Sequence, residues 1–247
     1  MKAYVIILQD HELGEEVGAQ AIEAAQQFDI DAIRYNAVDG YYSKAKFDRY
    51  GIDKFLNYTI IDKPGHQGCF LSHYELWIKC VELNEPIIIM EHDGIFIRPL
   101  PEDILDHFDE VMRLDCFQWF MDGYNESVEE SISQPIDYFH RTFDYEYYCT
   151  GGYYIGAYGY IIKPAGAKKL IEFAKNRGVV CTEVMLGEKI VNVVSTTATV
   201  IRMHPHYIGQ DVKFSTTYNL GLAKPGNNSL VNPTYISPSR YRKLYLN

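Results

Sequence analysis

The sequence predicts an α/β fold with a Rossmann-like, mostly parallel sheet flanked by helices. Two runs of consecutive apolar residues, at 3–8 and 87–90, are typical of strands buried on both faces. The segment 68–84 between them places apolar residues at helical spacing. Strands that alternate with helices indicate a doubly wound sheet, whose ligands bind at the carboxyl ends of the strands.

Proline and glycine help to set the expected element boundaries. Pro86 ends the helix at 68–84, and Pro164 fits the first turn of a helix. We expect a turn at 37–40 and a long, tyrosine-rich loop at 122–150. The other elements expected in chain order are a helix at 14–28, a strand at 32–35, a helix at 101–113, a strand at 116–120, a strand at 153–163, helices at 164–176 and 182–192, and a strand at 199–203.

Composition narrows the class of protein. The 247 residues carry a net charge of −10, which weighs against duplex nucleic acid as a partner. Five scattered cysteines without a C-x-x-C pair disfavour a disulfide framework and a zinc site. The N-terminus lacks the long apolar region of a secretory signal, so we expect a cytoplasmic protein.

The charge is distributed unevenly along the chain. Every acidic residue lies at or before Asp211, and the segment after it carries five basic residues. We expect one domain over 1–220 and a basic C-terminal tail over 221–247. Such a tail on an acidic body could contact phosphate, an anionic membrane surface or its own domain.

Two acids directly follow the apolar strand at 87–90. Glu91 and Asp93 are two positions apart, so both side chains would face one side if the extended geometry continues. Carboxylate oxygens at the carboxyl end of a strand suit Mg²⁺ or Mn²⁺ held jointly with substrate phosphates. A solvated turn is the alternative interpretation of the same residues.

Several stretches agree in order and spacing with one known pattern. Residues 68–73 read G-C-F-L-S-H and lead through a helix and an apolar strand to Glu91-His92-Asp93. This stretch resembles the signature block of glycosyltransferase family 25, which is G-C-x-x-S-H, a helix, a strand and Glu-Asp-Asp. The first strand with 37–40, the stretch 156–171 and the stretch 205–216 agree as well, so the resemblance covers roughly residues 1–220.

The resemblance implies a GT-A type glycosyltransferase domain and inverting transfer from a UDP-sugar with a divalent metal, Mn²⁺ or Mg²⁺. It makes Asp93 the main metal ligand, with Glu91 assisting or binding the ribose. His204 or His206 could complete the metal shell, since imidazole suits Mn²⁺, and a polar loop histidine is the alternative for each. The residues expected to bind the donor are Leu8, Gln9, Asp39, Gly68, Ser72, Glu91 and His92.

The reaction needs a base for the acceptor hydroxyl. Glu183 is our candidate, because the family usually shows an Asp at the start of a helix there. The alternative interpretation of Glu183 is an acid with no catalytic role, of the kind that is common in the first turn of a helix. Asp211 is the second candidate. Ser72 and His73 are adjacent on one helix and so do not face each other, which argues against a hydrolase dyad.

Two departures from the family pattern leave other functions open. His92 stands at the middle position of the acidic triplet, and residues 9–13 lack the usual arginines. A non-catalytic nucleotide-sugar-binding module and a nucleotide-sugar hydrolase are the alternatives to a transferase. The acceptor stays open among a cell-surface glycan, a hydroxylated protein side chain and a modified nucleobase.

Overall fold

A computed structural model describes residues 1–55, 63–114, 132–140, 157–179, 182–186 and 190–204. None of the helices within these residues has the length and apolar composition that a membrane crossing requires. The expected tail at 221–247 lies outside them. The elements in chain order are β1 (Lys2–Ile7), α1 (Glu12–Gln26), β2 (Asp31–Asn36), the 3₁₀ helix η1 (Gly40–Tyr42), α2 (Ser43–Tyr50), α3 (Pro64–Leu83), β3 (Ile87–Glu91), β4 (Gly94–Phe96), the 3₁₀ helix η2 (Ile104–Asp106), β5 (Val111–Arg113), β6 (Tyr138–His140), β7 (Gly159–Ile162), α6 (Pro164–Asn176), α7 (Thr182–Met185), β8 (Val193–Thr196) and β9 (Ile201–Met203).

The main sheet has seven strands in the order β2-β1-β3-β7-β5-β8-β6. The pairs β1–β2, β1–β3 and β5–β8 are parallel, while β7 and β6 run antiparallel to their neighbours. Five of the seven strands therefore point the same way, which confirms the predicted mostly parallel sheet. The short strands β4 and β9 form a separate antiparallel pair.

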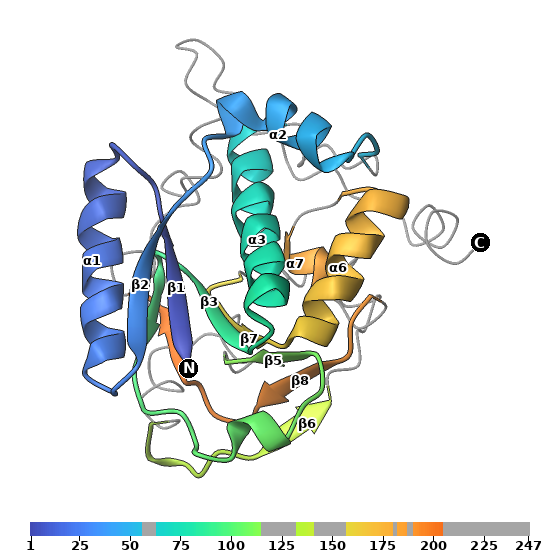
Figure 1. Cartoon of the computed structure of the whole chain (residues 1–247). Coiled ribbons are helices and arrows are strands. Elements are labelled where there is room, and N and C mark those ends of the chain that lie inside the picture. Colours follow the sequence, from blue (N-terminus) through green and yellow to red (C-terminus); the bar gives the residue numbers. More distant parts are fainter. Residues whose placement is uncertain (56–62, 115–131, 141–156, 180–181, 187–189, 205–247) are drawn as a thin grey trace, which may run out of the picture.

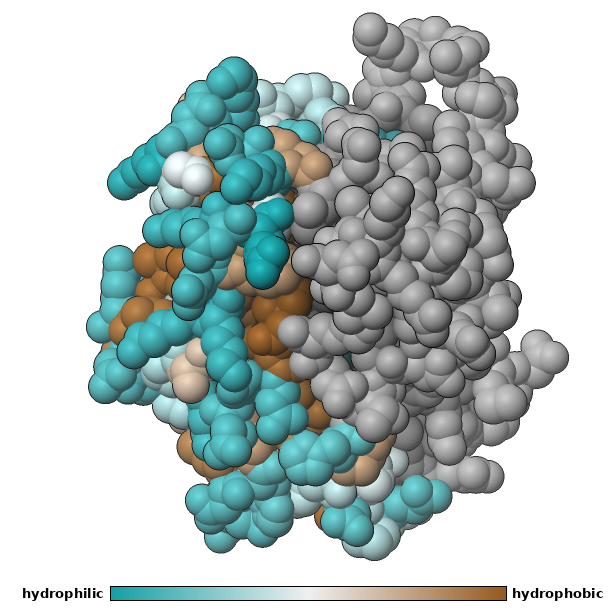
Figure 2. Space-filling model, turned by 90° about the vertical axis from the view of Figure 1, so that its right-hand side faces the viewer, coloured by the Kyte–Doolittle hydropathy of each residue, from teal (hydrophilic) through white to brown (hydrophobic). Residues whose placement is uncertain are grey.

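Helices cover both faces of the sheet (Figure 1). One core cluster joins alternate residues of β1 and β3, such as Ile6 and Ile89, to the buried faces of α3 and α6. The other joins the intervening residues, such as Val5 and Ile88, to α1 and to the β4–β9 pair. The continuous apolar runs of β1 and β3 are explained by this burial on both sides. Polar residues dominate the coloured part of the face in Figure 2, and its hydrophobic surface is confined to areas between them.

Most element predictions before residue 93 are confirmed. The predicted strands at 3–8, 32–35 and 87–90 correspond to β1, β2 and β3, and the helix at 14–28 corresponds to α1. The helix predicted at 68–84 begins earlier, because Pro64 occupies its first turn, where a missing N–H costs nothing. It ends as expected, with Asn84 in the left-handed conformation before Pro86.

Several later predictions are wrong. The helix predicted at 101–113 is only the 3₁₀ turn η2 followed by β5, because Val111 and Met112 pack on opposite faces of the sheet. The loop predicted at 122–150 contains β6, which pairs with β8. The helix predicted at 182–192 ends at Met185, and β8, which begins at Val193, was not predicted. The helix at 164–176 is confirmed as α6, and the strand predicted at 116–120 lies outside the described residues.

Candidate functional site

A cavity of about 300 Å³ opens at the carboxyl ends of β1, β2 and β3. This is the edge at which the fold class predicts a ligand. The loops after the three strands and the first turns of α3 form its walls. The lining residues are Ile6, Leu8, Gln9, Asp10, His11, Ala37, Val38, Asp39, Gly40, Tyr41, Gly65, Gly68, Cys69, Ser72, His73, Glu91 and His92.

The wall between the loop at 37–40 and α3 is built from close backbone contact. A Cβ atom on Gly68 would lie 2.5 Å from the carbonyl oxygen of Val38, so only glycine fits there. The buried hydroxyl of Ser72 accepts a hydrogen bond from the Val38 N–H at 2.9 Å and donates one to the Gly68 carbonyl at 2.7 Å. Gly68 and Ser72 therefore line the cavity while they fix its shape.

The loops after β1 and β2 supply mainly acidic and neutral polar groups. The Asp39 carboxylate accepts a hydrogen bond from the Tyr41 N–H at 2.9 Å and so caps η1. His11 Nδ1 caps α1 by accepting from the Gly14 N–H at 3.0 Å. Among the described residues that line the cavity there is no lysine and no arginine.

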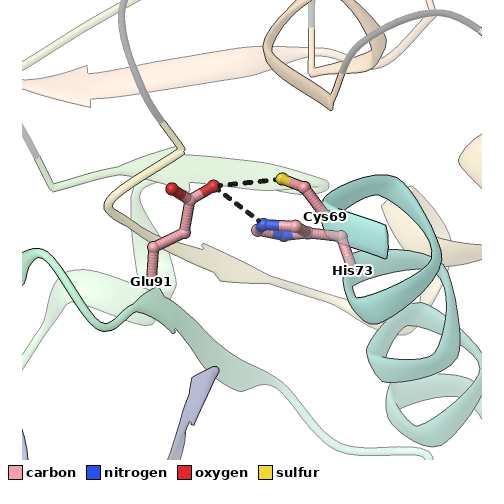
Figure 3. A group of neighbouring side chains, drawn as sticks. All are labelled: Cys69, His73 and Glu91. Atoms are coloured by element: carbon pink, nitrogen blue, oxygen red, sulfur yellow. Dashed lines mark hydrogen bonds and ion pairs between the residues drawn. The ribbon is translucent and has the colours of Figure 1, made fainter. Parts of the chain in front are cut away.

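Glu91 ends β3 and contacts two residues of α3 (Figure 3). Its Oε1 lies 3.1 Å from His73 Nε2 and 3.6 Å from Cys69 Sγ. Burial alone would raise the pKa of Glu91, but its interactions with His73, above all the hydrogen bond, outweigh the effect of burial, and the pKa is lowered. This carboxylate is therefore ionised at neutral pH.

Asp93, two residues further on, lies in the opposite kind of environment. Its Oδ1 is buried and has no hydrogen-bond partner among the described residues. Burial raises the pKa of Asp93 well above its usual range, and the charges of Glu91 and Glu183 raise it further. Three carboxylates thus act on one another at the end of β3, which is a field that a divalent cation would neutralise.

Two histidines lie beside the acids. His92 is buried, and burial lowers its pKa to about 4, so its imidazole is neutral at pH 7. The His204 N–H donates to the Asp93 carbonyl at 2.6 Å, which places the two residues side by side. The His204 ring, however, forms a hydrogen bond through Nε2 with Gln20 Oε1 of α1 at 2.8 Å. That nitrogen is therefore engaged by the protein.

The structure gathers the predicted donor-binding residues in one place. Leu8, Gln9, Asp39, Gly68, Ser72, Glu91 and His92 all line the cavity. Asp93, Glu183 and His204 are outside the lining, although Glu183 acts electrostatically on both Asp93 and Cys69. Asp211 and His206 lie outside the described residues.

Three site residues, Cys69, His73 and Tyr160, were not singled out as ligands or positioning groups by sequence reasoning. Cys69 and His73 hold their ligand atoms within 4.8 Å of each other and of the predicted ligand Glu91, and Tyr160 bonds to the far side of the His73 ring. Cys69 and His73 are four residues apart on α3, a spacing that puts both on one face of the helix. That spacing is visible in the sequence, whereas the approach of Tyr160 from β7 is not.

The fold and the cavity define an α/β protein with a ligand cavity at the carboxyl edge of its sheet. The model of glycosyltransferase family 25, described as an LPS biosynthesis protein family, matches residues 2–185, so the chain belongs to this family. The resemblance recognised in the stretch 68–93 is thereby confirmed.

Related proteins share only part of their length with the chain. A "Glycosyltransferase 25 family member" of Aedes aegypti is 29% identical over 109 residues, which is 44% of this chain and 17% of that protein. The lipooligosaccharide biosynthesis protein lex-1 of Haemophilus influenzae is 27% identical over 137 residues, covering 52% of this chain and 44% of that protein. The crystal structure of mouse xyloside xylosyltransferase 1, apo form, has a TM-score of 0.34 at 8% identity, covering 74% of this chain and 79% of that one.

Proposed function

We propose that the chain is a metal-dependent glycosyltransferase of GT-A type that moves a hexose from a UDP-sugar to an acceptor hydroxyl with inversion. Its membership of glycosyltransferase family 25 supports sugar transfer. The observation that carries the rest is the buried, unpartnered oxygen of Asp93 beside Glu91 and Glu183. Leaving such a polar atom unpaired is costly, which favours a ligand that pairs it.

The cavity is the proposed donor site. Its volume of about 300 Å³ lies in the range typical of small-molecule sites. Asp39 follows β2. In dinucleotide-binding folds, an acid at such a position accepts a hydrogen bond from a ribose hydroxyl. No lysine or arginine among the described lining residues would balance the charge of the leaving diphosphate, which favours a metal cation in that role.

Asp93 and Glu91 are the proposed metal ligands. Hard carboxylate oxygens fit Mn²⁺ or Mg²⁺, and Asp93 offers an oxygen that no described residue occupies. When bound, the cation would supply charge stabilisation to the leaving diphosphate. His204 is a weaker candidate ligand than the sequence suggested, because its Nε2 is bonded to Gln20.

Glu183 is the proposed base. It belongs to the first turn of α7 and lies near enough to Asp93 and Cys69 for its charge to raise the pKa of both. An ionised carboxylate there could take the proton of the acceptor hydroxyl as the new glycosidic bond forms. Asp211 stays the alternative base as a prediction.

A cell-surface glycan is the acceptor class that the relatives favour. The family description mentions LPS biosynthesis, and the Haemophilus influenzae relative is named for lipooligosaccharide biosynthesis. A hydroxylated protein side chain and a modified nucleobase stay as alternatives. Cytoplasmic location and contact of the basic tail with a membrane also stay predictions.

The direct test is turnover of a panel of UDP-sugars by the full chain with Mn²⁺, Mg²⁺ or EDTA, with and without glycan acceptors. We expect UDP release that needs both the metal and an acceptor. Release of free sugar without acceptor would instead indicate a hydrolase. Binding of a UDP-sugar with no turnover under any condition would indicate a non-catalytic module.

A further inference from the structure

A chain of buried polar side chains leads from the core to Glu91. Trp77 Nε1 lies 2.9 Å from the Tyr160 hydroxyl oxygen, and that oxygen lies 2.9 Å from His73 Nδ1. His73 Nε2 then lies 3.1 Å from Glu91 Oε1. Trp77, His73 and Tyr160 are completely buried, so water cannot replace any of these bonds.

The groups at its two ends, an indole N–H and a carboxylate, fix the direction in which the hydrogen bonds of this chain are donated. The Trp77 indole can only donate, so the Tyr160 oxygen accepts from it. The single hydroxyl hydrogen of Tyr160 then has one remaining partner among the described residues, which is His73 Nδ1. If Nδ1 accepts, Nε2 carries the ring proton and donates it to Glu91, which as an ionised carboxylate can only accept.

The opposite tautomer leaves a defect. A proton on His73 Nδ1 would make the Tyr160 oxygen accept twice, and the hydroxyl hydrogen would have no described acceptor in a dry environment. An imidazolium at His73 would leave the same hydrogen unpaired. Buried polar groups without partners are rare because their desolvation is uncompensated.

The tautomer of His73 also decides whether Cys69, His73 and Glu91 can form a metal site. Their ligand atoms are close enough for a metal site, but a metal would need the lone pair of His73 Nε2. In the chain of hydrogen bonds this nitrogen carries the ring proton, so it has no lone pair to offer.

We infer that His73, Tyr160 and Trp77 are positioning residues that hold Glu91 by a one-directional chain of donors, and that the Cys69–His73–Glu91 group orients this carboxylate instead of binding a metal. The chain engages Oε1 only (Figure 3). Oε2 makes no hydrogen bond with any described residue, so it is kept available at the cavity that Glu91 lines. The kinetic part of this inference rests on the proposed function, whereas the proton position does not.

The proton position is tested by ¹⁵N–¹H correlation of the histidine rings in the full-length protein. The His73 signals are assigned by their loss in the variant His73→Gln. We expect a single neutral tautomer with the proton on Nε2, unchanged when equimolar Zn²⁺ is added. A proton on Nδ1, an imidazolium at neutral pH, or loss of the Nε2–H signal on addition of Zn²⁺ would overturn the inference.

A matched pair of variants tests positioning. His73→Gln keeps an N–H donor near Glu91, whereas His73→Met has similar length and no donor. We expect His73→Met to raise the KM for the UDP-sugar about 10- to 100-fold, and His73→Gln to recover most of this loss. Equal loss in both variants, with Tm values matching wild type, would contradict a positioning role.

The two proposals fail in different ways. If wild-type protein turns over no UDP-sugar, the proposed function fails, but the ring spectrum still decides the direction of the chain. Tyr160→Phe then gives a second reading of the same spectrum. We expect the proton to stay on Nε2, where Glu91 accepts it, while the ¹⁵N shift of Nδ1 changes because Nδ1 loses its donor. An unchanged Nδ1 shift would count against the chain of hydrogen bonds.

Discussion

Two clusters of polar side chains, one around Glu75 of α3 and one around Asp93 after β3, are built in opposite ways. Glu75, on the side of α2, accepts hydrogen bonds from the hydroxyls of Tyr35 and Tyr50 and from Lys46 Nζ, at 2.8, 2.7 and 2.5 Å. At the end of β3, by contrast, Asp93 has a buried oxygen without a partner. Both clusters are partly removed from water, but within the part of the chain that the structure describes only the first includes a cation, which is Lys46.

The difference is between an acid that neighbouring groups of the protein compensate and an acid that the described residues leave uncompensated. Burial alone would raise the pKa of Glu75, but its hydrogen bonds with Lys46 and the two tyrosines lower it. The pKa of Asp93 is raised by burial and by two neighbouring carboxylates. A perturbed acid that the protein leaves uncompensated beside a cavity marks a functional site.

Loss of the proposed base should have the largest effect. We expect Glu183→Gln to lower kcat by about 100- to 10,000-fold, because the acceptor hydroxyl would lose its proton acceptor. Metal-dependent binding of UDP should be retained, since the proposed metal ligands are Asp93 and Glu91 and not Glu183. Steady-state kinetics measure the first effect and calorimetry the second. A near-normal kcat would contradict Glu183 as the base and favour Asp211 in that role.

Asp93→Asn tests the uncompensated cluster itself. We expect activity to fall by at least about 100-fold, because the amide is a poorer metal ligand than the carboxylate. The Mn²⁺ concentration needed for half-maximal activity should rise as well. Activity that keeps its wild-type dependence on Mn²⁺ would remove Asp93 from the metal site.

Glu75→Gln tests the compensated cluster. We expect a loss of about 1–3 kcal/mol in the free energy of unfolding, because hydrogen bonds to a charged group are weakened. We expect kcat to be unchanged, because Glu75 does not line the cavity. The folded pKa of Glu75 is lowered. Its stabilisation is therefore complete above the unfolded pKa and is lost as pH falls through the folded pKa. Urea unfolding of both proteins between pH 7 and pH 3 should show the difference in stability shrinking.

The smallest expected effects are shifts in Tm, and they compare the clusters around Asp93 and Glu75 most directly. Asp93→Asn should raise the Tm of the metal-free protein by a few degrees, since the amide cannot take on the charge that burial and two neighbouring carboxylates oppose. Glu75→Gln should lower the Tm. Thermal unfolding in EDTA compares the two variants directly, and a lower Tm for Asp93→Asn would mean that the carboxylate stabilises the fold without a ligand.

The sequence was informative where local pattern determines structure. The buried strands, the proline and glycine signals, and the stretch 68–93 correctly indicated the sheet edge where the cavity lies, and the residues predicted to bind the donor line that cavity. The sequence failed where distant residues decide. The stretch 101–113 joins a sheet through β5, and β8 pairs with β5 and β6, which helical periodicity cannot reveal. The contact of His73 with Tyr160 spans 87 residues, so no spacing rule finds it.

The central claim is that the acids at the end of β3 bind a cation that in turn binds a diphosphate. Calorimetric titration of the full chain with UDP, in Mn²⁺ and in EDTA, tests it most directly. The account predicts binding that requires Mn²⁺ in the wild-type protein and is lost in Asp93→Asn. Equal UDP affinity with and without Mn²⁺, and in wild type and variant alike, would contradict it.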